Sequence, residues 1–256
     1  MATYKKKGQK KIKNATIDKI EEESTTAEVF KNLEQTASKS EQWVEKFQKP
    51  LFYGLIFVIF LILGYIAYNS YIIEPKEHDA ANELAYPKEN FDLAINATTE
   101  SDSLFTLALE GGINGKYGFV DIADKYSGTK AGNLANYYAG ISYLKINDYK
   151  TAISYLEKFS SKDALLAPAA LGAIGDAFAD LDQNKEALSY YEKAANTQAN
   201  LSTTPLFLLK AGNTALDLGD AVKAEKLFTQ IKNKYSKSSI ANNIDMHINK
   251  AKYAQK

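Results

Sequence analysis

The side chains that could catalyse a reaction or bind a metal are few and widely separated in this chain of 256 residues. Its two histidines, His78 and His247, have no partner at the spacing of a metal site or a catalytic triad. The absence of cysteine excludes disulfides, zinc thiolate sites and cysteine nucleophiles. Asp176 and Asp180 lie on one face of a predicted helix, as paired-carboxylate catalysis would require, but most such pairs are solvated. We therefore expect no enzyme, metal, cofactor or small-molecule substrate, and a membrane-bound enzyme is the least favoured class.

Two short segments deserve a chemical interpretation of their own. The glycine-rich residues 111–115 could suggest a phosphate-binding loop, but no Gly-Lys-Ser/Thr follows and no strand precedes them, so we interpret them as a flexible loop. Asp102-Ser103-Leu104 resembles the Asp-Ser/Thr-aliphatic site at which some bacteria O-glycosylate periplasmic proteins. Asp102 also suits a helix N-cap, and the sequence leaves glycosylation at Ser103 open.

The longest apolar segment is an unbroken run of 23 uncharged, mostly apolar residues, 51–73. A helix of this length exceeds the hydrocarbon core of a bilayer, which is about 30 Å thick. The run begins far into the chain, is longer than the apolar region of a signal peptide, and lacks a small-residue cleavage pattern after it. We predict one retained transmembrane helix over residues 50–73.

The distribution of lysine predicts the orientation of this helix. Residues 1–50 carry eleven lysines and eight acidic residues, a net charge of +3, whereas the rest of the chain has a net charge of −3. Lysine-rich flanks face the cytoplasm. We therefore expect a single-pass protein of the bacterial inner membrane with a cytoplasmic N-terminus and a periplasmic C-terminal domain.

The predicted cytoplasmic segment has two parts. Residues 1–23 are rich in charge and poor in apolar side chains, which indicates a disordered tail, and its lysines lack the aromatic side chains that would suggest nucleic-acid binding. Residues 24–49 show apolar positions at intervals of three and four up to Pro50, which indicates an amphipathic helix. This helix could bind lipid, pack on a partner protein or form a solvated linker.

An internal repeat dominates the sequence beyond the apolar run. Three glycines are each followed twelve residues later by an alanine, and a large apolar residue comes four positions after each alanine. The glycines and alanines are Gly140 with Ala152, Gly175 with Ala187, and Gly212 with Ala224. Two antiparallel helices can approach closely where such small residues meet, so we expect each glycine to face its alanine.

The stretches YAGISYLKINDYKTAISYLEKF, AIGDAFADLDQNKEALSYYEKA and KAGNTALDLGDAVKAEKLFTQI resemble the tetratricopeptide repeat (TPR), whose period is 34 residues. The resemblance implies an all-α chain: a transmembrane helix followed by a TPR-like α-solenoid of about three repeats. Residues 74–128 would form a linker and degenerate leading helices, broken near Pro87. Residues 129–256 would form the repeats and a C-terminal capping helix.

The TPR resemblance also implies a protein-binding groove on the first helix of each repeat. The positions that line this groove in the family correspond here to Leu134, Tyr137, Ile141 and Leu144 in the first repeat, Asp176 and Asp180 in the second, and Leu206, Leu209, Asn213 and Leu216 in the third. The alternative is that several of these side chains pack on neighbouring helices.

The layout of a short N-terminus, one anchor and a TPR-like domain resembles the ancillary subunit of the bacterial SecYEG translocon. That resemblance implies a non-enzymatic accessory of protein translocation that binds a periplasmic prolyl isomerase chaperone or emerging chains. The alternative is a structural scaffold of another cell-envelope assembly, such as a secretion or motility complex. The sequence does not indicate the oligomeric state.

Overall fold

The structure is a computed structural model that describes residues 25–113 and 115–255, so the predicted disordered tail lies outside the described residues. The chain divides into two compact units, Met1–Tyr68 and Asn69–Lys256. Within the described ranges the elements are helices, joined by turns and one isolated bridge between Gly112 and Lys116. This confirms the predicted all-α class.

The first unit contains one long helix, α2 (Thr25–Tyr68). We predicted a helix that ends at Pro50, and this boundary is wrong, because α2 continues through Pro50. The proline removes one backbone donor, but its fixed φ is compatible with a helix and good helix formers surround it. Every residue from 51 to 68 is exposed. In the described part of the chain, this segment belongs to the one helical stretch that is long and apolar enough to span a membrane.

The second unit begins with three consecutive helical segments, the π-helical η1 (Asn69–Ile73), α3 (Glu74–Glu83) and α4 (Ala85–Asn96). The predicted interruption near Pro87 is present, although the helices separate at Leu84. Pro87 then lies in the first turn of α4, where its missing N–H costs little.

The leading helices α5 (Ser101–Glu110) and α6 (Phe119–Lys125) pair differently from the predicted degenerate repeat. α5 packs mainly along α4, and α6 packs mainly along α7 (Lys130–Lys145). Ring contacts explain this arrangement, because Phe91 of α4 meets Phe105 of α5 at 5.6 Å and Phe119 of α6 stacks on Tyr138 of α7 at 5.2 Å between centroids. Asp102 does not cap α5, since the helix starts at Ser101 without a side-chain cap.

The predicted flexible loop at residues 111–115 begins as a tight turn. The Gly112 N–H donates to the Lys116 carbonyl at 3.0 Å, and Gly111 has a φ of +86°. A side chain at Gly111 would meet the backbone of residues 116–118, so this glycine is required by its conformation and by its surroundings. Ile113, which follows Gly112, is exposed.

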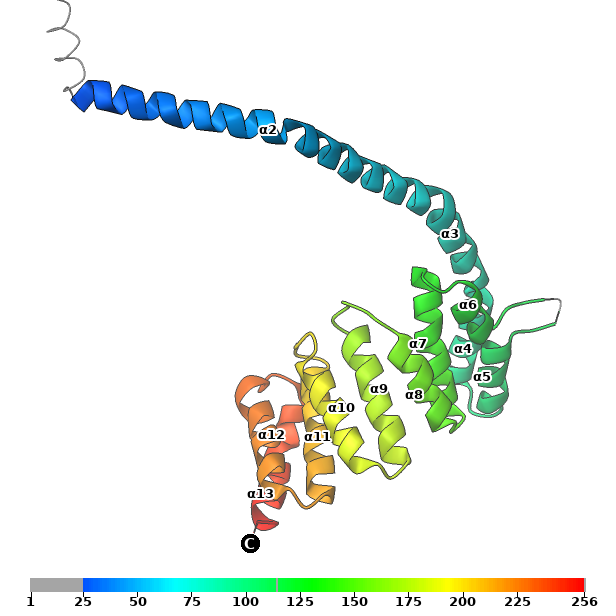
Figure 1. Cartoon of the computed structure of the whole chain (residues 1–256). Helices are drawn as coiled ribbons and strands as arrows, with labels where there is room; N and C mark the ends of the chain where they lie inside the picture. Colours follow the sequence, from blue (N-terminus) through cyan, green and yellow to red (C-terminus); the bar gives the residue numbers. More distant parts are fainter. Residues whose placement is uncertain (1–24, 114, 256) are drawn as a thin grey trace, which may run out of the picture. The chain divides into compact units, whose positions relative to one another are not determined.

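Three antiparallel helix pairs follow, as the repeat predicts (Figure 1). The pairs are α7 with α8 (Tyr149–Lys158), α9 (Leu166–Asp180) with α10 (Asn184–Asn196), and α11 (Thr204–Asp217) with α12 (Ala221–Lys234). The turn inside each pair uses a residue of positive φ at the same position, namely Asn147, Asp182 and Gly219. These residue types tolerate the left-handed region, which is why the turns could be predicted.

The side chain nearest to each repeat glycine is the large residue of the second helix and not the predicted alanine, although the Ala152 carbonyl also lies close to Gly140. A Cβ added to Gly175 would lie 2.7 Å from the Tyr191 ring, and one added to Gly140 would lie 2.5 Å from Leu156. Gly212 faces Phe228 in the same way. Each glycine therefore accommodates the large residue of the second helix. The alanines Ala152, Ala187 and Ala224 are fully buried beside these contacts.

The C-terminal cap consists of η2 (Ser239–Asn243) and α13 (Ile244–Tyr253). Ser238 accepts the Ala241 N–H at 3.3 Å and so begins η2, and α13 starts later. Ile244 and Ile248 of α13 are buried in the core cluster of the third pair, beside Phe228 and Ile231. The cap thus closes the apolar end of the solenoid, as repeat folds require.

Candidate protein-binding surface

The first-repeat groove residues are largely used for packing. Ile141 and Leu144 are half-buried and pack against the cluster of Leu156, Ala170, Ala173 and Ile174 between the first two helix pairs. The ring of Tyr137 lies 5.1 Å from that of Phe159. Burial, followed by the nearby Tyr138, raises the pKa of Tyr137. Leu134 is half-buried on the same helix, so this part of the predicted groove offers little free apolar surface.

Asp176 of the second repeat already has two partners. Its Oδ1 accepts the Tyr191 hydroxyl at 2.7 Å and pairs with the Lys210 ammonium at 2.6 Å. Burial, and then Asp176, raise the pKa of Tyr191. This triad joins α9, α10 and α11 and is about one-third exposed at its charged ends. Asp180, one turn further on, is exposed at the end of α9.

The third-repeat residues offer the most accessible part of the predicted groove. Leu206 is 39% exposed in the first turn of α11. Leu209 and Leu216 are partly buried against the core cluster of the third pair, and Asn213 is half-buried between them. Their order along α11 gives an apolar stripe with one amide. Such a stripe can take up an apolar segment of a partner and orient it by hydrogen bonding.

Lys210, which lies beside this stripe, was not predicted from the sequence as a site residue. The signal that could have revealed it is charge complementarity at one repeat period, because Lys210 follows Asp176 by 34 residues. Gly172, also on α9, was another informative position. A Cβ there would meet the Phe207 ring, so Gly172 provides close contact between the second and third pairs.

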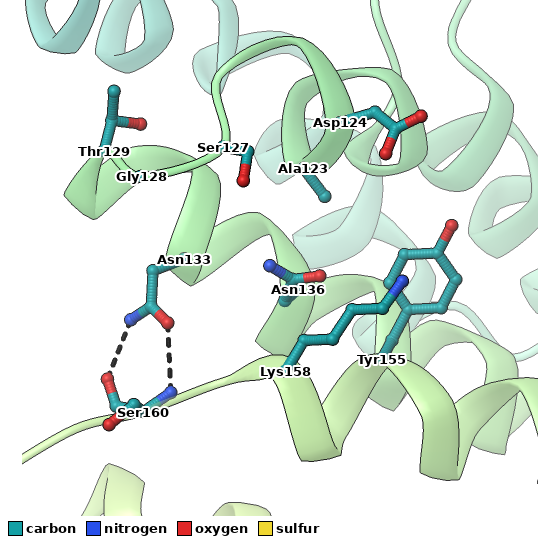
Figure 2. Close-up of a pocket in the computed structure, with 10 residues that line it drawn as sticks. All are labelled: Ala123, Asp124, Ser127, Gly128, Thr129, Asn133, Asn136, Tyr155, Lys158 and Ser160. Carbon is teal, nitrogen blue, oxygen red and sulfur yellow. Dashed lines mark hydrogen bonds between the residues drawn. The ribbon is translucent and has the colours of Figure 1, made fainter.

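A polar cavity of about 530 Å³ was also missed (Figure 2). It lies between α6, α7 and α8. Asn133 bridges to Ser160, donating to its carbonyl at 2.8 Å and accepting its N–H at 3.0 Å. The Lys158 ammonium lies 4.8 Å from the centroid of the Tyr155 ring. Burial, and then Asp124 and Asp121, raise the pKa of Tyr155.

Potential metal ligands are scattered over the described ranges. Among those residues no group of three His, Cys, Asp or Glu side chains could hold a metal ion. His78 hydrogen-bonds with Asn82 at 3.2 Å, and the His247 ring lies 5.2 Å from that of Phe228. Both histidines are therefore engaged in local contacts.

Comparison with known proteins agrees with this architecture. The family model described as "Tetratricopeptide repeat" matches residues 134–164 and 207–238, which belong to the first and third helix pairs. A crystal structure of TPR-like repeats of a predicted kinesin light chain from Podospora anserina has a TM-score of 0.51 and 12% identity, and the match covers 69% of this chain and 87% of that one. The comparison with curated proteins gave no match. The fold is therefore a TPR-like α-solenoid with a long apolar N-terminal helix and a C-terminal helix.

Proposed function

We propose that this chain of tetratricopeptide repeats is a single-pass membrane protein that binds other proteins beside the bilayer. TPR solenoids are protein-interaction modules, and no catalytic family matches this one. The observation that carries the proposal is that every residue from 51 to 68 is exposed in an apolar segment attached by sequence to the solenoid. Exposed apolar surface of this extent requires a bilayer or a protein to cover it. The lysine excess of residues 1–50 supports a cytoplasmic N-terminus and a periplasmic solenoid.

The partner site in this proposal is the stripe on α11. Leu206 is the exposed entry to it, and Leu209, Asn213 and Leu216 continue it along the helix. The first-repeat positions contribute less, because Ile141 and Leu144 are covered by the second pair. An apolar stripe with an amide suits an extended or helical segment that exposes hydrophobic side chains.

The specific role we propose is that of an accessory subunit of the SecYEG translocon. In this role the anchor lies beside the translocon, and the stripe receives a periplasmic prolyl isomerase chaperone or an emerging chain. The support is the layout of anchor and repeats. A scaffold for another envelope assembly would share this layout, so the experiment must distinguish the two by partner and by dependence on export.

The test is site-specific photo-crosslinking in the full chain. A crosslinker at Leu206 should capture a chaperone or a nascent secreted chain, and one at Ile56 should capture a translocon subunit. Ser189, exposed on α10, is the matched control position and should capture neither. The charge-introducing variant Leu206→Glu should weaken capture without unfolding, because Leu206 is exposed.

Two results would separate the hypotheses. Loss of the Leu206 crosslinks when export is blocked, with folding intact, supports the translocon role. The same non-translocon partner at both Leu206 and Ile56, independent of export, contradicts the translocon role and supports a scaffold.

A further inference from the structure

One edge of the solenoid is joined directly to the helix that follows the apolar run. The carboxylate of Glu77, on α3, accepts the backbone N–H groups of Lys130 at 2.5 Å and Ala131 at 2.9 Å. Lys76 donates to the Ser127 carbonyl at 3.2 Å. α3 is thereby fixed to the start of α7. We call the edge formed by the starts of α7, α9 and α11 and the ends of α8, α10 and α12 the α3 edge.

Hydrogen bonds continue along the α3 edge from one repeat to the next. Asn133 in the first turn of α7 holds Ser160 in the loop after α8. The Asn200 amide, in the loop before α11, donates to the Ala164 carbonyl at 2.8 Å. The loops before α9 and α11 therefore lie side by side, and Figure 1 shows them on the side of the solenoid at which α3 joins it.

The balance of charge differs between this edge and the opposite one. The α3 edge carries exposed lysines at helix ends and in loops: Lys130, Lys158, Lys162, Lys193, Lys234 and Lys237. Several of its carboxylates are engaged, since Glu77 and Asp163 accept backbone N–H groups and Asp245 pairs with Lys232. The turns on the opposite edge carry more acids than lysines: Asp148, Asp180, Asp182, Glu186, Asp217 and Asp220 against the exposed Lys145, Lys150 and Lys185.

The helix dipole accounts for only part of this difference, namely for Lys158, Lys193 and Lys234 in the last turns of α8, α10 and α12 and for Asp148 and Asp220 at the N-caps of α8 and α12. Lysines are favoured at helix C-termini and acids at N-termini. Lys130 nevertheless lies at the N-terminus of α7, and Asp180 and Asp217 lie at the C-termini of α9 and α11. Lys162 and Lys237 lie in loops, where the dipole has no preference.

The α3 edge also presents two exposed leucines. Leu165 is 55% exposed and Leu201 is 58% exposed, and they lie in the two neighbouring loops joined by Asn200. Leu165 is close in sequence to Lys162. Apolar side chains among lysines are the combination by which peripheral segments bind the interface of an anionic bilayer.

The chain connectivity places this edge near the membrane if residues 51–73 span it. Glu77 follows Ile73 by four helical positions, a rise of about 6 Å. The N-terminus of α7 then lies within about one Debye length, roughly 10 Å, of the headgroups. We propose that the α3 edge docks on the anionic surface of the bilayer, with its lysines at lipid phosphates and Leu165 and Leu201 in the interface. This inference rests on the membrane anchor of the proposed function.

The test uses the full chain reconstituted in vesicles, and the absence of native cysteine allows a single label. Ser202→Cys, beside Leu201, and Gln183→Cys, in a turn of the opposite edge, are both exposed positions. With a lipid-borne quencher in vesicles of 30% anionic and 70% zwitterionic lipid, the label at residue 202 should be quenched at least twice as strongly as the label at 183. High salt or purely zwitterionic lipid should reduce this difference.

Matched substitutions test the chemistry of the edge. A double variant, Lys162→Glu with Lys237→Glu, removes two lysines of the α3 edge. It should lower the ratio of membrane-docked to undocked solenoid by about fivefold or more per lysine. Leu165→Ser with Leu201→Ser should lower it also, whereas Lys150→Glu with Leu218→Ser, exposed on the opposite edge, should not. These side chains are exposed, so folding should be retained, and circular dichroism checks it.

A chain that still floats with the vesicles after treatment with alkaline carbonate has its anchor inserted in the bilayer. Equal quenching of the labels at residues 202 and 183 in such a chain overturns the docking proposal alone. Failure to float overturns the anchor as well. Shielding of residue 202 only when a protein partner is present also overturns the proposal, and identifies the edge as a protein-binding surface.

Discussion

Asp176 is the residue at which the second and third helix pairs are joined by charge as well as by packing. Its carboxylate accepts the Tyr191 hydroxyl and pairs with Lys210, so a position that the family uses for ligands serves here in part to connect helices. A single sequence could show Asp176 on the correct helix face. It could not show which neighbours fill its hydrogen bonds, because Tyr191 and Lys210 come from two other helices.

The Tyr191 contact makes a prediction about alkaline pH. Burial and Asp176 raise the pKa of Tyr191, whereas an unfolded tyrosine ionises at about pH 10. Above that pH the unfolded chain loses a proton that the folded chain retains, so stability is full below about pH 10 and falls as the pH rises further. The urea midpoint should drop between pH 8 and pH 11, and the drop should be smaller in Tyr191→Phe.

The control for this prediction is Tyr253→Phe, at an exposed residue of α13. Its pH dependence should match that of the wild type. Because burial also raises the pKa of Tyr137, Tyr143 and Tyr155, Tyr191→Phe removes only part of the drop. A midpoint that falls equally in both variants would contradict the assignment to Tyr191.

Gly175 makes a prediction about packing. Gly175→Leu places a side chain into the Tyr191 ring, which should cost about 1–3 kcal/mol or more despite leucine's better helix propensity. The melting temperature should fall by about 2–4 °C per kcal/mol. Ala199→Leu, at an exposed loop position, is the control. The double variant Gly175→Leu with Tyr191→Ala should cost less than the sum of the single ones, and strict additivity would argue against the contact.

At the scale of elements, local signals decided what could be predicted. The three helix pairs follow from apolar periodicity and from turn residues such as Asn147 and Gly219, which act within a few positions. The pairing of α4 with α5 and of α6 with α7 could not be predicted, because it depends on ring contacts through space, of Phe91 with Phe105 and of Phe119 with Tyr138. The path of α2 through Pro50 was missed, since a proline signals only a probable helix end.

The contact between α3 and α7 makes a prediction at the same scale. Glu77→Ala should leave the first N–H groups of α7 without their acceptor and cost about 1 kcal/mol. Hydrogen exchange at residues 130 and 131 should accelerate. Glu89→Ala, an exposed acid on α4, should leave this exchange unchanged. Unchanged exchange in Glu77→Ala would show that Glu77 does not cap α7 in solution.

At the scale of the whole molecule, the proposed topology makes the last prediction. In that topology the N-terminus is cytoplasmic, as the lysine excess of residues 1–50 predicts. Protease added to intact spheroplasts should then remove the solenoid and spare an epitope at residue 1. Permeabilised spheroplasts are the control, in which the epitope should also be lost. Protection of the solenoid in intact spheroplasts would reverse the topology and contradict the translocon role.

The Glu77 contact also bears on the order of folding. Most helices of the solenoid pack on their neighbours in sequence, so their contacts are local and can form quickly as the chain emerges N-terminus first. The Glu77 carboxylate can accept the Lys130 N–H only after residue 130, which lies 53 positions later in the chain, has been synthesised. The start of the solenoid can therefore close against α3 only after the leading helices have been synthesised. The contact between α3 and α7 would then form late for the N-terminal end of the unit. The helix pairs after α7 could then fold onto it one after another.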